Sequence, residues 1–388
     1  MNNILFEFSS VEKIIFGTNQ SQRLGKIVRD FGESALLITG KMPDRHQLLL
    51  DDLQKNSIKF TTFPIDNEPT IDMVMEGTKF ARQYNPQVMI ALGGGSVLDA
   101  GKAIAGMMTN PGDPLDYLEV IGKGKAIQNQ ATPLIAIPTT SGTGAEVTRN
   151  AVLLSPEHKT KVSLRSALLL PTIALLDPSL TISMPPAVTA SSGLDALTQL
   201  IEAFTCNTPN AMIDALCLEG ILLAARSLPI AFSDGSNQQA REEMALASMY
   251  SGLALANSRL GAVHGIAGPF GGIFHAPHGA VCARLLPVVT KTNVQQLREN
   301  DTDHTTLKKY KQVAQLLTGN EQATIEEGIS WLEEIVKDFD IPTLKHYGLT
   351  PDKYDELIEK ALKSSSMKGN PVSLFPQVLE DILDIAIQ

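Results

Sequence analysis

Val88-Met-Ile-Ala-Leu-Gly93-Gly94-Gly95-Ser96 joins an apolar run to three glycines, and Val97-Leu-Asp99-Ala-Gly-Lys102 continues it with a helical pattern. The order strand, glycine turn, helix is typical of a unit in a parallel sheet. Glycines let a backbone approach a diphosphate closely, and the amides and dipole of a helix N-terminus favour an anion. The segment predicts a phosphate-binding loop. It lacks the GxGxxG pattern, so a simple tight turn is the alternative.

Short apolar runs alternate with helical segments through the first half of the chain, which predicts a parallel sheet covered by helices. After Met184-Pro-Pro186 long apolar periodic segments follow, such as 211–225 and 242–256, and these predict helices. We therefore expect an α/β domain at 1–184 and an all-helical domain at 185–388. The expected strands are 35–40, 60–65, 88–93, 133–138 and 172–176, with a hairpin of 151–154 and 161–164.

A second polar loop, 138–148, follows the buried run 133–138 and gathers hydroxyl groups and glycines, among them Thr139 and Thr140. Open α/β sheets bind ligands outside the carboxyl ends of their strands. Two such loops at strand ends favour a ligand site, and the alternative is a solvated Ser/Thr turn.

Bulk properties limit the possible partners. The chain has 388 residues, 43% of them apolar, and a formal net charge of −10. An acidic balance disfavours nucleic acid, because phosphate backbones attract clusters of Lys and Arg. No stretch reaches the roughly 18 uninterrupted apolar residues of a membrane span, and the first residues lack the pattern of a signal segment. We expect a soluble cytoplasmic protein that acts on small molecules, with no nucleic acid or membrane as partner.

The cysteines give no sign of a disulfide framework or a thiolate metal site. Cys206, Cys217 and Cys282 are few, odd in number and without CxxC spacing. The sequence predicts that they are buried packing residues.

One carboxylate and two imidazoles in the second half suggest a metal site. Asp195 lies in an apolar helical segment, and His264 and His278 lie in two later segments, Ala-Val-His-Gly and Ala-Pro-His-Gly. This mixed ligand set suits Fe(II) or Zn(II) and leaves coordination positions open. For lone histidines the alternative is a hydrogen-bonded core residue. The set points to Lewis-acid chemistry on an oxygen atom.

Five motifs in series resemble the iron-containing (group III) alcohol dehydrogenase family, over nearly the whole chain and in the expected order. The resemblance implies an N-terminal dinucleotide-binding α/β domain, an all-helical C-terminal domain of dehydroquinate synthase-like fold, and a cleft between them for nicotinamide, metal and substrate. It also implies cofactor contacts at Gly94, Gly95, Ser96, Thr139, Thr140 and Leu180, with Asp99 closing the cofactor loop and Lys102 lining the cleft. The motifs are Gly93-Gly-Gly-Ser96 with Asp99 and Lys102, Ile137 to Gly144 with Glu146, Leu176-Asp-Pro-Ser-Leu180, Gly193-Leu-Asp195-Ala and Pro277-His278-Gly279.

The chain departs from the family pattern at two positions. Gln199 stands where the family has a metal-binding His one helical turn after Asp195, and Gly268 stands where it has a further His that serves as a candidate proton relay. An i, i+4 pair shares a helix face, so Gln199 still points where a ligand would. Either Asp195, His264 and His278 hold a divalent ion with water or Gln199 completing the site, or the site is metal-free. We expect a retained metal, because three protein ligands and an open position are usual in catalysis.

The residue at the end of the first predicted strand bears on the choice between NAD(H) and NADP(H). Relatives that prefer NAD often carry an acidic residue there, whereas this chain has Gly40, with Lys41 and Arg45 close behind. A carboxylate would repel a 2′-phosphate, so its absence favours NADP(H) over NAD(H). The alternative is a helix-start turn with exposed basic residues.

Two residues near the histidines each have more than one possible role. His275 is interpreted as a replacement ligand, a proton donor or a surface loop residue. Arg259 is interpreted either as the partner of a carboxylate or phosphonate on the substrate or as part of a structural salt bridge. Together with His264 and Lys102, they are the residues that we expect to act in catalysis.

The leading hypothesis is a metal-dependent NADP(H)-linked reductase that interconverts an aldehyde or ketone, including anionic ones, and an alcohol. The alternatives are a dehydroquinate synthase-like lyase and a catalytically weak NADP(H)-binding relative. We also expect a homodimer or larger homo-oligomer, in which the apolar segment 4–8 pairs across a subunit interface.

Overall fold

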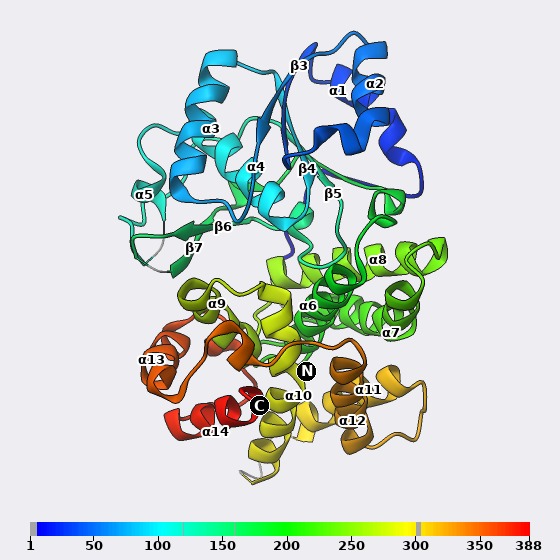
Figure 1. The fold of residues 1–388 in the computed structure, drawn as a ribbon, viewed down its shortest axis with the longest axis vertical. Helices are drawn as coiled ribbons and strands as arrows, with labels where there is room; N and C mark the ends of the chain where they lie inside the picture. The colour runs from blue at the N-terminus through cyan, green and yellow to red at the C-terminus, as the bar shows by residue number, and fades with distance from the viewer. Residues whose placement is uncertain (1–5, 119, 159, 300–303) are drawn as a thin grey trace. The chain divides into compact units, whose positions relative to one another are not determined.

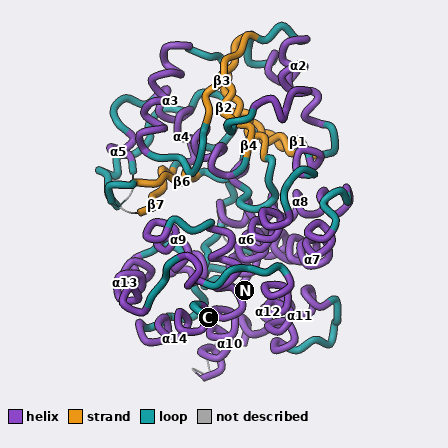
Figure 2. Tube along the Cα trace, viewed as in Figure 1, coloured by secondary structure: helices purple, strands orange, loops and turns teal. Residues whose placement is uncertain are grey.

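The computed structural model describes residues 6–118, 120–158, 160–299 and 304–388 and divides into two compact units. We call Ser9–Thr140 with Gly144–Ile182 the sheet unit, and Ser183–Gln388 with residues 6–8 and Ser141–Thr143 the helical unit. In the described chain, strands occur only in the sheet unit (Figure 2). These units match the expected fold class, an α/β part followed by a helical part. The division at Ser183 lies two residues before the boundary expected from sequence.

The main sheet has six strands in the order β1-β8-β5-β4-β2-β3, and every neighbouring pair is parallel. From β2 the chain passes to β3 on one side and then returns to β4 on the other, so the strand order reverses between β2 and β4. The strands are β1 (Lys13–Phe16), β2 (Ser34–Thr39), β3 (Lys59–Pro64), β4 (Val88–Gly93), β5 (Leu134–Pro138) and β8 (Ile173–Leu176). A separate antiparallel hairpin joins β6 (Asn150–Ser155) and β7 (Thr160–Arg165).

Two helix pairs cover the two faces of the main sheet (Figure 1). Alternate residues of β2 separate between the two cores: Leu36 and Ile38 join the core with α3 and α4, whereas Ala35 and Leu37 join the core with α1 and α2. The central strands β4 and β5 are buried along their full length, as expected for a sheet covered on both faces. The helices are α1 (Leu24–Arg29), α2 (Gln47–Lys55), α3 (Ile71–Tyr84), α4 (Gly95–Thr109) and the short α5 (Pro114–Tyr117).

Helix α4 packs unusually close to the sheet. A Cβ atom at Gly101 would lie 2.6 Å from the Cβ of Ala91 on β4, which is closer than real Cβ atoms approach. Small residues on both sides therefore set the distance between helix and strand. The start of α4 is held directly behind the end of β4.

The helical unit encloses one large apolar core. Helix α7 is long and apolar enough to cross a membrane by length and composition. Its buried residues belong to this core, and cytoplasmic location stays a prediction. The helices are α6 (Pro186–Thr205), α7 (Ala211–Ser233), α8 (Gln238–Asn257), α9 (Ala262–Phe274), α10 (His278–Glu299), α11 (His304–Thr318), α12 (Ile325–Asp338), α13 (Tyr354–Lys363) and α14 (Pro376–Ala386).

Two details differ from the sequence-based expectation, and a third is not tested by the described residues. Strand β1 was not expected, because it is a short edge strand with two exposed residues and no clear alternation. Residues 141–143 group with the helical unit, where the Ser251 hydroxyl donates to the carbonyl of Gly142 at 3.2 Å. Segment 4–8, expected at a subunit interface, lies partly outside the described residues, and that oligomer contact stays a prediction.

Candidate functional site

The sheet unit gathers the expected cofactor residues at the carboxyl ends of its strands. Gly40 follows β2, Gly94 follows β4, Thr139 follows β5 and Leu180 comes shortly after β8. These strands are parallel, so their carboxyl ends lie on one edge of the sheet. The loops after β2 and β4 flank the point where the strand order reverses, and open α/β sheets bind ligands at that point.

The glycine loop leads straight into α4. Gly94 is the N-cap of this helix in extended conformation, and Gly95 is its first residue. A Cβ at Gly94 would lie 3.4 Å from the side chain of Thr140, so the second polar loop adjoins the first. The amide of Thr139 donates to the carbonyl of Gly93 at 3.0 Å and fixes this arrangement. Free amides of a 15-residue helix and hydroxyl groups thus share one half-buried place suited to a phosphate.

Asp99 and Lys102 form a buried pair on α4. The Lys102 ammonium lies 2.8 Å from Asp99 Oδ1 and donates to Thr148 Oγ1, also at 2.8 Å. Asp99 Oδ2 accepts from the amide of Val152 at 3.2 Å. Burial raises the pKa of Asp99, and the Lys102 charge opposes that rise. Asp99 thus contacts the hairpin, and Lys102 contacts Thr148 just before it. The Lys102 side chain is 1% exposed, and its charge is paired inside the sheet unit. The cofactor role of Asp99 and the catalytic role of Lys102 stay predictions.

Glu146 adds a second carboxylate near Lys102. Burial raises the pKa of Glu146 to about 7, while a backbone hydrogen bond and Lys102 act against it. It lies near the end of the second polar loop, in the motif that the family resemblance also includes.

The end of β2 has room for a ligand. No atom lies within 4 Å of the position that a Cβ at Gly40 would take. Lys41 is exposed and pairs with Asp66, with 3.1 Å between Nζ and Oδ2. Arg45 is exposed as well. The basic side chains expected here are present, and the charge of Lys41 is partly balanced.

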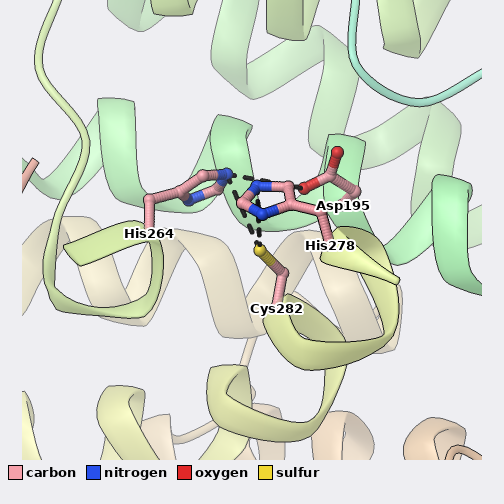
Figure 3. A group of neighbouring side chains, drawn as sticks. All are labelled: Asp195, His264, His278 and Cys282. Carbon is pink, nitrogen blue, oxygen red and sulfur yellow. Dashed lines mark hydrogen bonds and ion pairs between the residues drawn. The ribbon is translucent and has the colours of Figure 1, made fainter. Parts of the chain in front are cut away.

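Three helices of the helical unit bring Asp195, His264 and His278 together (Figure 3). Asp195 lies on α6, His264 on the first turn of α9 and His278 at the start of α10. The Nε2 atoms of His264 and His278 lie 3.4 Å and 3.8 Å from Asp195 Oδ1. A Cβ at Gly279 would lie 2.3 Å from the carbonyl oxygen of Ser191, so the lack of a side chain there allows α10 to approach α6.

Glu202, on α6 two helical turns after Asp195, orients His264. Its Oε2 lies 2.7 Å from His264 Nδ1, and its Oε1 accepts from the amide of Val263 at 2.7 Å. A carboxylate only accepts, so Nδ1 carries a proton, and Nε2 is the ring atom that faces Asp195 and could bind a metal ion. This is the outer support that a metal-binding histidine usually has. Glu202 was not expected from the sequence, although its spacing from Asp195 puts both on one helix face.

The cluster is rich in negative charge. Burial raises the pKa of Asp195, but His264 and His278 outweigh it and lower that pKa below its usual range. Burial lowers the pKa of His264, but the Cys282 sulfur, Asp195 and Glu202 outweigh it and raise that pKa well above its usual range. Two buried carboxylates therefore demand a positive charge between them, which a proton or a metal ion supplies.

Cys282 joins the same cluster from α10. Its Sγ lies 3.8 Å from His264 Nε2 and 3.6 Å from His278 Nε2 (Figure 3). The other two cysteines, Cys206 and Cys217, are buried elsewhere in the helical unit. All three cysteines are buried, as expected, and Cys282 in addition lies in the cluster, which the sequence did not predict. Its spacing of four residues after His278 was the signal in the sequence.

Gln199 lies beside Asp195 on α6, as expected. Its Nε2 faces Asp195 Oδ2 at 3.5 Å. Gln199 Oε1 and Asp195 Oδ1 are buried without a hydrogen-bond partner in the described part of the chain. Buried polar atoms normally have partners, so these two oxygens mark a place for a further group.

The donor set fits a divalent ion. One ligand atom from each of Asp195, His264, His278 and Cys282 lies within 4.8 Å of every other. Metal bonds to nitrogen and oxygen are about 2.0–2.2 Å, so two such donors on a tetrahedral zinc ion lie about 3.3–3.5 Å apart. The observed separations of 3.4 Å and 3.8 Å between imidazole nitrogen and Asp195 oxygen are close to this value.

The remaining expected residues lie around the start and end of α9. Arg259 is exposed and forms no ion pair with the residues that the structure describes, so the structural salt bridge has no support there. His275 is exposed at the C-cap of α9, in left-handed conformation with φ 53°. Gly268 is one turn after His264, and nothing lies within 4 Å of the position of a Cβ. Space is therefore open where the family carries its further His.

Comparisons with known proteins agree along the whole chain. Residues 11–178 match the family model "Iron-containing alcohol dehydrogenase", and residues 189–387 match "Fe-containing alcohol dehydrogenase family, C-terminal". Alcohol dehydrogenase 4 of Saccharomyces cerevisiae (strain ATCC 204508 / S288c) is 35% identical, covering 95% of this chain and 92% of that protein. Choline dehydrogenase of Bacillus subtilis (strain 168) is 33% identical, covering 95% and 91%. The crystal structure of a 1,3-propanediol oxidoreductase superposes with a TM-score of 0.91 at 32% identity, covering 98% of this chain and 100% of that one.

Replacing Glu202 by Gln tests its role toward His264. The amide oxygen can still accept from Val263, but an amide nitrogen beside Nδ1 donates and shifts the ring proton to Nε2. We expect the affinity for Zn(II) or Co(II), measured by competition with a chelator, to fall by about 10- to 100-fold. Glu243→Gln is the matched control, because Glu243 pairs with Arg226 elsewhere in the helical unit. Equal affinities in wild type and Glu202→Gln would contradict the assignment.

Proposed function

Because the chain belongs to the iron-containing alcohol dehydrogenase family, we propose that it interconverts an aldehyde or ketone and an alcohol with NADP(H) and a divalent ion. The observation that carries the proposal is the convergence of Asp195, His264 and His278 in one cluster, where Asp195 Oδ1 is buried without a hydrogen bond from the described residues. The three relatives described above are named dehydrogenases or an oxidoreductase. Neither the lyase nor the catalytically weak alternative has an observation of its own in its favour.

The side chains and amides of the protein would bind the ion and the cofactor and orient the substrate. Asp195, His264 and His278 would hold the ion, with Glu202 fixing the tautomer of His264. Amides at the start of α4 would bind the diphosphate, with Thr139 and Thr140 beside it. When bound, the ion polarises a carbonyl oxygen, and the nicotinamide provides the hydride.

The source of the proton is open among three groups. Gly268 leaves no side chain one turn after His264, so a relay at that place needs water. The exposed His275, solvent and the cofactor ribose are the candidates. Gly268 also leaves room for substrate beside the cluster.

Removing the divalent ion tests the Lewis-acid role. We expect chelation to lower the aldehyde-dependent loss of NADPH absorbance by more than about 100-fold, because stabilising a developing alkoxide contributes several kcal/mol. Fe(II) and Zn(II) should each be tested for restoring the rate. The control is NADPH binding, followed by fluorescence, which should survive chelation because its contacts lie in the sheet unit. Full turnover by protein shown to be metal-free would refute the proposal.

The preference for NADP(H) rests on Gly40 and its surroundings. Open space and the absence of a carboxylate leave room for a 2′-phosphate, and Lys41 and Arg45 supply positive charge nearby. Asp66 offsets part of the Lys41 charge, so the open space is the stronger support.

Replacing Gly40 by Asp should reverse this preference. The new Cβ would meet no atom within 4 Å, and the carboxylate would repel a 2′-phosphate and accept from a ribose hydroxyl. We expect the ratio of kcat/KM for NADPH to kcat/KM for NADH to fall by about 10- to 100-fold, the range of a charged hydrogen bond. Gly40→Asn, of equal size and no charge, is the control and should change the ratio much less. A wild-type enzyme that prefers NADH would contradict the proposal directly.

Arg259 supports an anionic substrate. It is exposed, lies five residues before His264 and has no ion-pair partner among the described residues. A guanidinium group binds carboxylate and phosphonate bidentately.

We expect Arg259→Ala to raise KM for an aldehyde that carries a carboxylate or phosphonate by about 10-fold, and to leave KM for a neutral aldehyde of the same length unchanged. Steady-state kinetics on the two aldehydes compares them in one protein. Equal changes for both substrates would remove Arg259 from substrate recognition.

Cytoplasmic location and a homo-oligomeric state complete the proposal.

A further inference from the structure

We propose that the thiolate of Cys282 is the fourth protein ligand of the divalent ion, in the place that Gln199 leaves without an imidazole. This inference rests on the proposed metal site and specifies its ligands. Asp195, His264 and His278 supply three donors, and the sulfur is the next ligand atom in the cluster.

The position of the sulfur fits a shared ion. A metal–sulfur bond of about 2.3 Å and a metal–nitrogen bond of about 2.1 Å put the two donors about 3.6 Å apart on a tetrahedral ion. Cys282 Sγ lies 3.6 Å from His278 Nε2 and 3.8 Å from His264 Nε2. The sulfur thus lies at ligand spacing from both rings, and it points toward them (Figure 3).

Helix geometry places the sulfur there. His278 and Cys282 are four residues apart on α10, so they share one face. Cys282 is buried completely.

Gln199 fits a supporting role better than a ligand role. Its nitrogen, a donor, faces Asp195 Oδ2, as the charge of a carboxylate requires. Its oxygen is neutral, and an amide oxygen binds a transition metal more weakly than a thiolate does. In this arrangement Gln199 holds Asp195 in place. A thiolate also makes the site softer, which favours Zn(II) and Fe(II) over Mg(II) and Mn(II).

Cobalt spectroscopy tests the proposal without cofactor or substrate. Co(II) bound to a thiolate shows a sulfur-to-metal charge-transfer band in the near ultraviolet, whereas oxygen and nitrogen ligands give only the weaker visible bands. The chain has three cysteines, so Cys206→Ala with Cys217→Ala leaves Cys282 as the sole sulfur of this type. We expect the near-ultraviolet band in wild type and in this double variant.

The band should be absent in Cys282→Ala and Cys282→Ser, and present in Gln199→Ala. We also expect Cys282→Ala to weaken Zn(II) binding by more than about 10-fold, the lower range for loss of an outer support. Circular dichroism of the metal-free proteins checks the fold, and the double variant decides the question even where Cys282 variants fail to fold.

Visible cobalt bands without a near-ultraviolet band in wild type would overturn the thiolate and leave the proposed function intact. A near-ultraviolet band that persists in Cys282→Ala would also overturn it. Conversely, the expected bands in a protein without chelator-sensitive carbonyl reduction would support the ligand and refute the proposed function. Failure of wild type to bind cobalt would refute both.

Discussion

Two carboxylates buried on one face of α6 set the constraint on which the candidate metal centre depends. A helix in an apolar core tolerates anions only where donors or cations compensate them. For Glu202, the compensation comes from the first turn of α9 and from the ring of His264. For Asp195, amide and imidazole groups are close, but one oxygen has no hydrogen bond in the described chain. The geometry of three helices follows from the need to neutralise these two groups, and an ion completes that balance.

Much of the fold could be predicted from local sequence patterns. The buried central strands read as continuous apolar runs, and the change to long periodic segments at Pro185 lies within two residues of the division at Ser183. The features that the sequence did not predict depend on tertiary contacts. Strand β1 has no pattern of its own and becomes a strand by pairing with β8. Residues 141–143 look like part of a strand-end loop, yet contacts with Ser192 and Ser251 place them in the helical unit.

The candidate site likewise contains residues that the sequence identified and residues that it did not. Residue type identified Asp195, His264 and His278, because carboxylate and imidazole carry obvious chemistry. Glu202 and Cys282 were missed, since each needs its neighbours to have a function: Glu202 needs the amides of α9, and Cys282 needs two rings on either side. Lys102 was expected through the family resemblance to line the cleft. Its ammonium is buried and pairs with Asp99, and its role in catalysis stays a prediction.

The close approach of α10 to α6 at Gly279 has a wider meaning for how such centres diversify. Because no side chain separates the two helices there, the first turn of α10 and the middle of α6 border the same small volume. A donor lost from one helix can then be replaced from the other without moving the ion. A classification of metalloenzymes that looks only for histidines at fixed alignment positions would count this chain as lacking a ligand. The backbone nevertheless brings a second donor, from another helix, close to the same place.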